Sequence, residues 1–278
     1  MINDLDDHGS SLMFADYASL LSLGAELEWV LEASVEHLQS ATSWFLANRF
    51  QLNEDKTQRI ICRLSREPCD PQNPVKLLGF VLDSKLSWNS HIQQVTSRLS
   101  RICFLLLKMR GLVTEKYLIM MYHALFHCHI TYGLLLWGHS AGAADVLRLQ
   151  KRAIRIITGS DHLALCKPIF ACLGVLTVFS HYILLCLVYV KKIQHTLVAR
   201  SDIHRNNTRR SELLDFPRRC LHRSQASYRI SALKFYNKLP NSVKQLDEAT
   251  FRRTVWKLLC AKAYYSVNEF MSDNLNFY

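Results

Sequence analysis

The stretch Leu12-Met13-Phe14-Ala15-Asp16-Tyr17-Ala18-Ser19-Leu20-Leu21 sets one carboxylate between two short apolar runs. Two such runs joined by a tight bend predict a β-hairpin, and the bend projects the acid from the edge of the sheet. An Ala-Asp pair between apolar residues is common in proteins. The motifs that follow it therefore decide how this hairpin is interpreted.

Seven further motifs follow the hairpin in order along the chain. They are Asn53-Glu54-Asp55-Lys56-Thr57, Val75–Asp83, Leu86-Ser87-Trp88 with His91-Ile92, Tyr132-Gly133 with Trp137-Gly138, Leu149–Arg155, Asn207-Thr208-Arg209 and Tyr236–Pro240. In this order and spacing they resemble the back half of a non-LTR retrotransposon (LINE-type, jockey-like) reverse transcriptase. Phe14-Ala15-Asp16-Tyr17 then resembles the Phe/Tyr-Ala-Asp-Asp box of that family, with Tyr17 in place of the second aspartate.

The resemblance runs from Ile2 to about Phe251 and implies an α+β fold that is mostly α-helical. It implies a partial palm over residues 1–85 (hairpin, helix and two strands) and a helical thumb over 86–200. A basic connector and C-terminal helices over 201–278 complete the fold. The fingers, the first catalytic aspartate and the endonuclease domain of such elements have no counterpart here. The chain is thus expected to be a truncated or decayed piece of a mobile element.

Apolar periodicity predicts the local structure independently of the resemblance. Glu26 to Arg49 repeats apolar residues at intervals of three and four, which is typical of an amphipathic helix. Gln58–Leu64 and Val75–Asp83 are expected to be strands, with Gly79 permitting a bend. Further helices are expected over 91–110, 114–132, 145–158, 179–195, 228–238 and 243–264.

Charge is distributed unevenly along the 278 residues. Residues 1–74 hold 5 Lys/Arg and 12 Asp/Glu, a net charge of −7, whereas residues 75–278 have a net charge of +18, which gives +11 for the whole chain. A basic excess on one portion indicates a polyanionic partner, most simply nucleic acid, with an anionic membrane surface as the second choice. A solvated basic surface without a partner is the third interpretation.

Two helical stripes of cations are the candidate nucleic-acid contacts. At about 100° per residue, Arg148, Lys151, Arg152 and Arg155 fall within an arc of about 100°, opposite the apolar residues of the same helix. Arg98, Arg101 and Lys108 form a similar stripe on the preceding thumb-like helix. Such cations favour sequence-independent phosphate binding to RNA or an RNA–DNA duplex. The alternative is an ordinary solvated helix face.

The resemblance also implies a two-metal site for Mg²⁺ or Mn²⁺, for which Asp16 is the remaining ligand. A tyrosine phenol is neutral at pH 7 and does not replace a carboxylate as a ligand for a hard cation. Asp4, Asp6 and Asp7 precede the hairpin in a segment that would not lie across from Asp16. We therefore expect no polymerase activity from this chain alone, unless a separate chain supplies the missing aspartate.

Lys56 occupies the place of a family motif near the leaving pyrophosphate, although a simple turn lysine explains it equally well. Nine cysteines without regular spacing indicate buried thiols in a reducing compartment. Cys62 and Cys69 have no partner pair at zinc-ligand spacing. His123 and His127 share a helix face with His129 and Cys128 nearby, and we expect these histidines to be core or interface residues.

One segment invites a membrane interpretation. Residues 169–190 carry no formal charge and are flanked by Lys167, Lys191 and Lys192. This segment is long enough to span a bilayer. Polar residues within the segment favour a buried helix instead. The first residues lack the basic and apolar regions of a secretory signal. An intracellular location, cytoplasmic or nuclear, is therefore expected.

The expected function is that of a reverse-transcriptase fragment that is inactive alone and retains residual RNA or RNA–DNA binding, with other retrotransposon-derived polypeptides as further partners. The alternative is a relic without function, or a protein-interaction module that uses surface once covered by lost domains. Loss of the fingers would expose apolar surface on the palm remnant, and such surface favours association.

Overall fold

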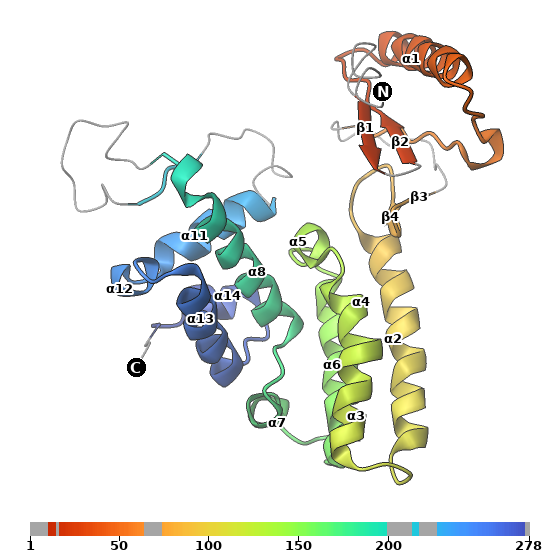
Figure 1. Ribbon diagram of the computed structural model, residues 1–278. Coiled ribbons are helices and arrows are strands. Elements are labelled where there is room, and N and C mark those ends of the chain that lie inside the picture. Colours follow the sequence, from red (N-terminus) through yellow and green to blue (C-terminus); the bar gives the residue numbers. More distant parts are fainter. Residues whose placement is uncertain (1–10, 15–16, 64–73, 199–212, 217–226, 276–278) are drawn as a thin grey trace, which may run out of the picture. The chain divides into compact units, whose positions relative to one another are not determined.

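The computed structural model describes residues 11–14, 17–63, 74–198, 213–216 and 227–275. They form an α+β chain that is mostly helical, with two small antiparallel sheets (Figure 1). The chain divides into two compact units, residues 1–59 and 60–278. The coarse fold class expected from the sequence is confirmed. The three-part division at residues 85 and 200 stays a prediction.

The first unit contains the predicted hairpin and the predicted helix. Strand β1 (Ser11–Phe14) pairs antiparallel with β2 (Tyr17–Leu20), with Phe14 opposite Tyr17. Helix α1 (Leu27–Ala47) follows, and then the 3₁₀ turn η2 (Glu54–Lys56). Asp16 lies outside the described residues, as do Asp4, Asp6 and Asp7.

Much of the apolar surface of the first unit is uncovered. Ala41 is the one residue of α1 that is buried, whereas Trp29 is 56 % exposed. On the hairpin, Leu12 and Phe14 are 71 % and 67 % exposed. A sheet and a helix are stable when their apolar faces pack against another layer. The described residues do not supply a full second layer for this unit.

The second unit contains a hairpin where the sequence predicted one continuous strand. Strands β3 (Val75–Leu77) and β4 (Phe80–Leu82) pair antiparallel, and Leu78-Gly79 form the two-residue turn between them. Both turn residues have positive φ, 48° and 82°, as a type I′ turn requires. The prediction was therefore wrong about continuity, because the turn residue Leu78 looked like one more strand residue.

The helices of the second unit form two neighbouring groups around one core (Figure 1). Helix α2 (Asn89–Met109) packs along α6 (Ala143–Thr158) and against a continuous helical segment between them in sequence. That segment is α3 (Glu115–Met121), the π-helical turn η3 (Tyr122–His127) and α4 (Cys128–Thr131). Short α5 (Leu134–Trp137) connects it to α6.

The C-terminal group is built on α8 (Val178–Ile193), which packs against α11 (Tyr228–Lys238) and α13 (Glu248–Lys262). Its remaining elements are short. They are α7 (Cys166–Leu173), the 3₁₀ turn η4 (Gln194–Thr196), α12 (Asn241–Lys244) and α14 (Val267–Ser272). Most of the basic connector, including Arg205, Arg209 and Arg210, lies outside the described residues.

Three further expectations differ from the structure. Residues 57–63 form no strand. Among the described residues they pair with no other strand, because β3 and β4 pair with each other. The helix expected over 243–264 is two helices, since the Asp247 side chain accepts a hydrogen bond from Thr250 N and starts α13 anew. The sequence missed α5, α7 and α14, which are short.

The uncharged stretch 169–190 is divided between α7 and α8. Gly174 ends α7 with φ 65°, and α8 starts after Thr177. Within the described part of the chain, no single helix has the length and apolarity needed to cross a bilayer. Only the pair α7 and α8 meets those criteria, with a bend of 50° between them.

Five aromatic residues from separate motifs meet at one end of α2. Phe80 of β4 stacks on Tyr132 at 4.9 Å between ring centroids and also contacts Trp88 and His91. Tyr132 donates through its hydroxyl to the carbonyl of Leu78 (2.5 Å), and Trp137 Nε1 donates to the carbonyl of Tyr132 (3.1 Å). These motifs therefore dock the β3–β4 hairpin onto the helices.

Gly133 is the tightest position of this aromatic cluster, which gives a first prediction. Its φ is 59°, and a Cβ there would lie 2.2 Å from the Phe80 ring. We expect Gly133→Ala to lower the free energy of unfolding by about 2–4 kcal/mol, through backbone strain and displacement of the ring. Urea denaturation followed by circular dichroism measures the loss.

Gly111→Ala is the matched control, because Gly111 also has positive φ (102°) but has no atom within 4 Å of the added Cβ. It carries the strain without the clash. Equal losses in the two variants would show that contact with Phe80 is not the cause.

Candidate nucleic-acid interface

The α2 cations lie on the side of the helix that faces away from the core. Ile92, Val95, Leu99, Cys103 and Leu106 are buried on one face. Arg98, Arg101 and Lys108 are all exposed, and α2 contains no acidic residue. Arg101 Nε donates to the Ser97 carbonyl of its own helix (3.4 Å), and Lys108 Nζ lies 5.4 Å from the Phe104 ring centroid. All three charges remain accessible to solvent.

The four cations of α6 occupy different environments. Arg148 and Arg152 are exposed, whereas Lys151 and Arg155 are half-buried. Arg148 forms an ion pair with Asp145. Arg155 donates through Nε and Nη2 to the carbonyl of Ala164, at 3.1 and 2.8 Å. Within the described residues Arg152 makes no hydrogen bond or ion pair, so it is the most available of the four.

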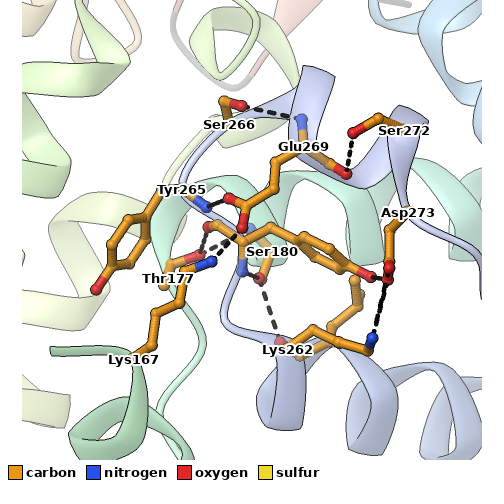
Figure 2. Close-up of polar contacts among 11 residues, drawn as sticks. Lys167, Thr177, Ser180, Lys262, Tyr265, Ser266, Glu269, Ser272 and Asp273 are labelled. Atoms are coloured by element: carbon orange, nitrogen blue, oxygen red, sulfur yellow. Dashed lines mark hydrogen bonds and ion pairs between the residues drawn. The ribbon is translucent and has the colours of Figure 1, made fainter. Parts of the chain in front are cut away.

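Lys151 belongs to a further cluster at the corner of α6 and α7, which we call the basic corner: Lys151, Arg155, Lys167, Tyr265 and Glu269. Lys151 Nζ lies 3.5 Å and Lys167 Nζ 5.0 Å from the Tyr265 ring centroid. Lys167 forms an ion pair with Glu269, whose other carboxylate oxygen accepts from Tyr265 N at 2.7 Å (Figure 2). The sequence offered no local signal for this cluster.

The backbone around Glu269 fixes one side of the basic corner. Ser266 Oγ accepts a hydrogen bond from Glu269 N (3.0 Å) and caps α14, as Figure 2 shows. Lys167 and the Tyr265 N–H both lower the pKa of the Glu269 carboxyl, outweighing desolvation, which raises it. Glu269 is therefore ionised at pH 7 and holds Lys167 in place.

The predicted catalytic residues contribute little to the described geometry. Asp16 lies outside the described residues, so no metal site can be built around it. Lys56 is exposed at the end of η2, and its backbone N–H donates to the Asn53 side chain at 3.1 Å. That is the contact of a capped turn. Within the described part of the chain no group of three or more His, Cys, Asp or Glu is placed to hold a metal ion.

Of the histidines expected to be core or interface residues, His127 packs against a histidine that the sequence did not associate with it, whereas His123 is exposed. His127 of η3 stacks on His181 of α8 at 5.0 Å, and His123 lies 5.4 Å from His127. The Nδ1 atoms of His127 and His181 are buried and have no hydrogen-bond partner. Desolvation by burial lowers the pKa of each to about 4, so both rings are neutral at pH 7.

An open hollow of about 440 Å³ lies in the first unit and is lined in part by Trp29, Glu32, Glu36 and His37. His37 Nδ1 is hydrogen-bonded to Ser22 Oγ at 3.0 Å. The negative charges of its two carboxylates would repel a phosphate backbone. The candidate contacts for nucleic acid are therefore on α2, α6 and the basic corner.

No protein-family model, no curated protein and no solved structure matches this chain.

Proposed function

We propose that this chain is a fragment of an RNA-directed DNA polymerase of the non-LTR retrotransposon type. In this proposal it transfers no nucleotides by itself and retains weak, sequence-independent binding to RNA or an RNA–DNA duplex. The ordered motifs from the Phe14-Ala15-Asp16-Tyr17 hairpin to Tyr236–Pro240 support the origin. The hairpin with α1 and the hairpin β3–β4 would be palm elements, and the helices from α2 onward the thumb and extension.

The observation that carries the binding proposal is the charge of α2 and α6. These two helices pack along each other and together hold seven Lys/Arg and one acidic residue, Asp145. Most of these cations are exposed, whereas the opposite sides of both helices are buried. Cations held on rigid helices neutralise phosphates without reading bases, which gives affinity that falls steeply with salt.

Catalysis is excluded from the proposal on electrostatic grounds. Polymerase chemistry uses two divalent cations about 3.5–4 Å apart. Their repulsion costs about 16 kcal/mol at an effective dielectric constant of about 20, and carboxylates must offset much of it. The hairpin supplies Asp16 and the neutral Tyr17, where the family has a second acid. Mg²⁺ or Mn²⁺ would therefore bind weakly here.

A protein-interaction module is the second candidate, and the exposed apolar surface of the first unit favours it. Leu12, Phe14 and Trp29 are more than half exposed in a sheet and a helix that would normally be covered. Such a module would bind a partner through apolar contacts and would respond little to salt.

The binding test uses labelled RNA and an RNA–DNA duplex, titrated at low and physiological salt. We expect Arg98→Glu combined with Arg101→Glu and Lys108→Glu to weaken binding at least tenfold, because three phosphate contacts become repulsive. The dependence of log K on log salt should become shallower by about 0.7–0.9 for each lost contact.

The matched control reverses three other exposed cations, Lys234, Arg253 and Lys257 on α11 and α13. It changes the net charge of +11 by the same amount. Equal weakening of binding in both triple variants would show that net charge, and not the position of the α2 cations, causes the effect. Binding that is absent or insensitive to salt would refute the proposal. Primer extension with Mg²⁺ or Mn²⁺ completes the test, since extension that is lost in Asp16→Ala would overturn the exclusion of catalysis.

A further inference from the structure

We infer that the basic corner is a seat for a phosphoryl group, held by Lys151, Lys167 and Arg155 around the Tyr265 ring. The inference deepens the proposed function, on which it rests where the phosphoryl group belongs to a nucleic-acid backbone. A free phosphate ion presents the same chemistry to the same side chains.

The geometry brings cations from two helices to one point. The ammonium groups of Lys151 on α6 and Lys167 on α7 lie 3.5 and 5.0 Å from the centroid of one aromatic ring. Arg155 lies one helical turn after Lys151 and is fixed by its two hydrogen bonds to the Ala164 carbonyl. Both lysines therefore lie near the same ring.

The negative charge at the basic corner is smaller than the positive charge. Glu269 is the one carboxylate of the cluster, and it is engaged with Lys167 and with Tyr265 N. The next carboxylate, Asp273, is bonded to Lys262 and to the Tyr264 hydroxyl. Lys151 and Arg155 thus have no acidic partner among the described residues, and an anion would supply the missing charge.

Burial is the largest cause of the pKa shifts of two groups at the basic corner. Partial burial, and then the nearby Arg155 and Lys167, lower the pKa of Lys151, with Cys166 and Glu269 acting in the opposite direction. Burial raises the pKa of the Cys166 thiol, which therefore stays neutral at pH 7. An anion that binds from solvent would favour the charged form of Lys151.

The start of α7 adds to the positive potential. Helix α7 begins at Cys166, and its N-cap residue Leu165 provides no side-chain hydrogen bond. The Cys166 thiol lies against the Lys151 carbonyl, which places this end of the helix beside α6. The positive end of a helix dipole favours oxyanions within its first turn. A tetrahedral phosphoryl group has enough oxygens to accept hydrogen bonds from Lys151, Lys167 and Arg155 at once.

Lys167→Gln tests the inference, with Lys262→Gln as the matched control. Both lysines belong to ion pairs with acids near the C-terminus, and their side chains are equally exposed at 42 %. We expect Lys167→Gln to weaken RNA binding three- to tenfold and to make the salt dependence shallower by about 0.7–0.9. Lys262→Gln should change the RNA affinity and its salt dependence only as much as removing one charge far from the bound RNA would.

Glu269→Gln separates a binding role from a structural one. The amide keeps an oxygen acceptor for Tyr265 N but removes the anion that competes with phosphate. We expect this variant to bind RNA and inorganic phosphate more tightly, while a purely structural ion pair would give unchanged or weaker binding. Thermal melting checks that each variant is folded.

The outcomes distinguish this inference from the proposed function. Salt-dependent RNA binding by the native chain, with Lys167→Gln and Glu269→Gln both behaving like Lys262→Gln, would refute the seat and leave the proposed function standing. Calorimetric binding of inorganic phosphate that depends on Lys167, without RNA binding, would support the seat and refute the proposed function. Binding of neither ligand would refute both.

Discussion

Replacing Gln150 with leucine is expected to lower the free energy of unfolding by about 3–5 kcal/mol. Gln150 is completely buried in α6, within the motif Leu149–Arg155. Its Nε2 donates to the Tyr122 hydroxyl and to the Leu176 carbonyl, both at 2.8 Å, and its Oε1 accepts from Val178 N at 2.9 Å. Leucine would leave three buried polar groups without partners.

The position of Gln150 explains why the loss would affect the whole second unit. Its partners lie on η3 and at the start of α8, so one side chain joins the two helix groups. A second group of buried hydrogen bonds continues this connection, because Thr177 Oγ1 donates to the Tyr264 carbonyl at 2.6 Å and Tyr264 N donates to Ser180 Oγ at 3.1 Å. Buried polar networks of this kind are costly when partly broken.

Chemical denaturation followed by helical circular dichroism measures the effect of Gln150→Leu, and Gln93→Leu serves as the control at an exposed glutamine of α2. The control should change stability by less than about 0.5 kcal/mol. Tyr122→Phe combined with Gln150→Leu should cost less than the sum of the single variants, since both partners of one bond are removed together. Similar stabilities of Gln150→Leu and Gln93→Leu would refute the network.

Acidification is expected to destabilise the second unit between pH 6.5 and pH 4, by about 3–5 kcal/mol from the stacked pair His127 and His181. The pKa of each ring is lowered from 6.5 to about 4 in the folded state, first by burial and then by neighbouring cationic groups. Below pH 6.5 the unfolded chain therefore binds protons that the folded chain does not. Stability is full above pH 6.5, falls as the pH drops, and levels off below pH 4.

The physical cause is visible in the contacts of the two rings. His127 and His181 stack at 5.0 Å with both Nδ1 atoms buried and unpaired, so an added proton would find no acceptor there. His123 lies beside His127, and Arg252 also lowers the pKa of His181. Protonation would thus add a buried charge next to other positive groups.

Urea titrations at several pH values between 4 and 8 measure the slope. His181→Leu should flatten it, because the group that takes up the proton on unfolding is removed. His162→Gln is the control, since His162 is 84 % exposed beside Asp161 and should leave the slope unchanged. A slope that stays the same in His181→Leu would assign the acid sensitivity to other buried histidines, such as His91 and His139.

Local patterns in the sequence were enough to locate the long helices and the first hairpin. The ends of helices α1, α2, α6, α8 and α11 lie within two residues of their expected ranges. A helix of three or more turns repeats its apolar spacing several times, so the signal accumulates. The outward position of the α2 cations follows from the same period. Short elements such as α5, α7 and α14 repeat it too few times to be recognised.

Tertiary contacts decided what the charged and polar side chains do. Periodicity alone treated Arg148, Lys151, Arg152 and Arg155 as equivalent, whereas the fold gives Arg148 an acid, Arg155 a carbonyl and Lys151 an aromatic ring. It also brings Lys167 to Glu269, 102 residues away. Pairing at such separations depends on how helices pack, and a local pattern of residue types carries no information about it. The sequence therefore determined which faces are basic, and the packing determined which of their charges remain available to a ligand.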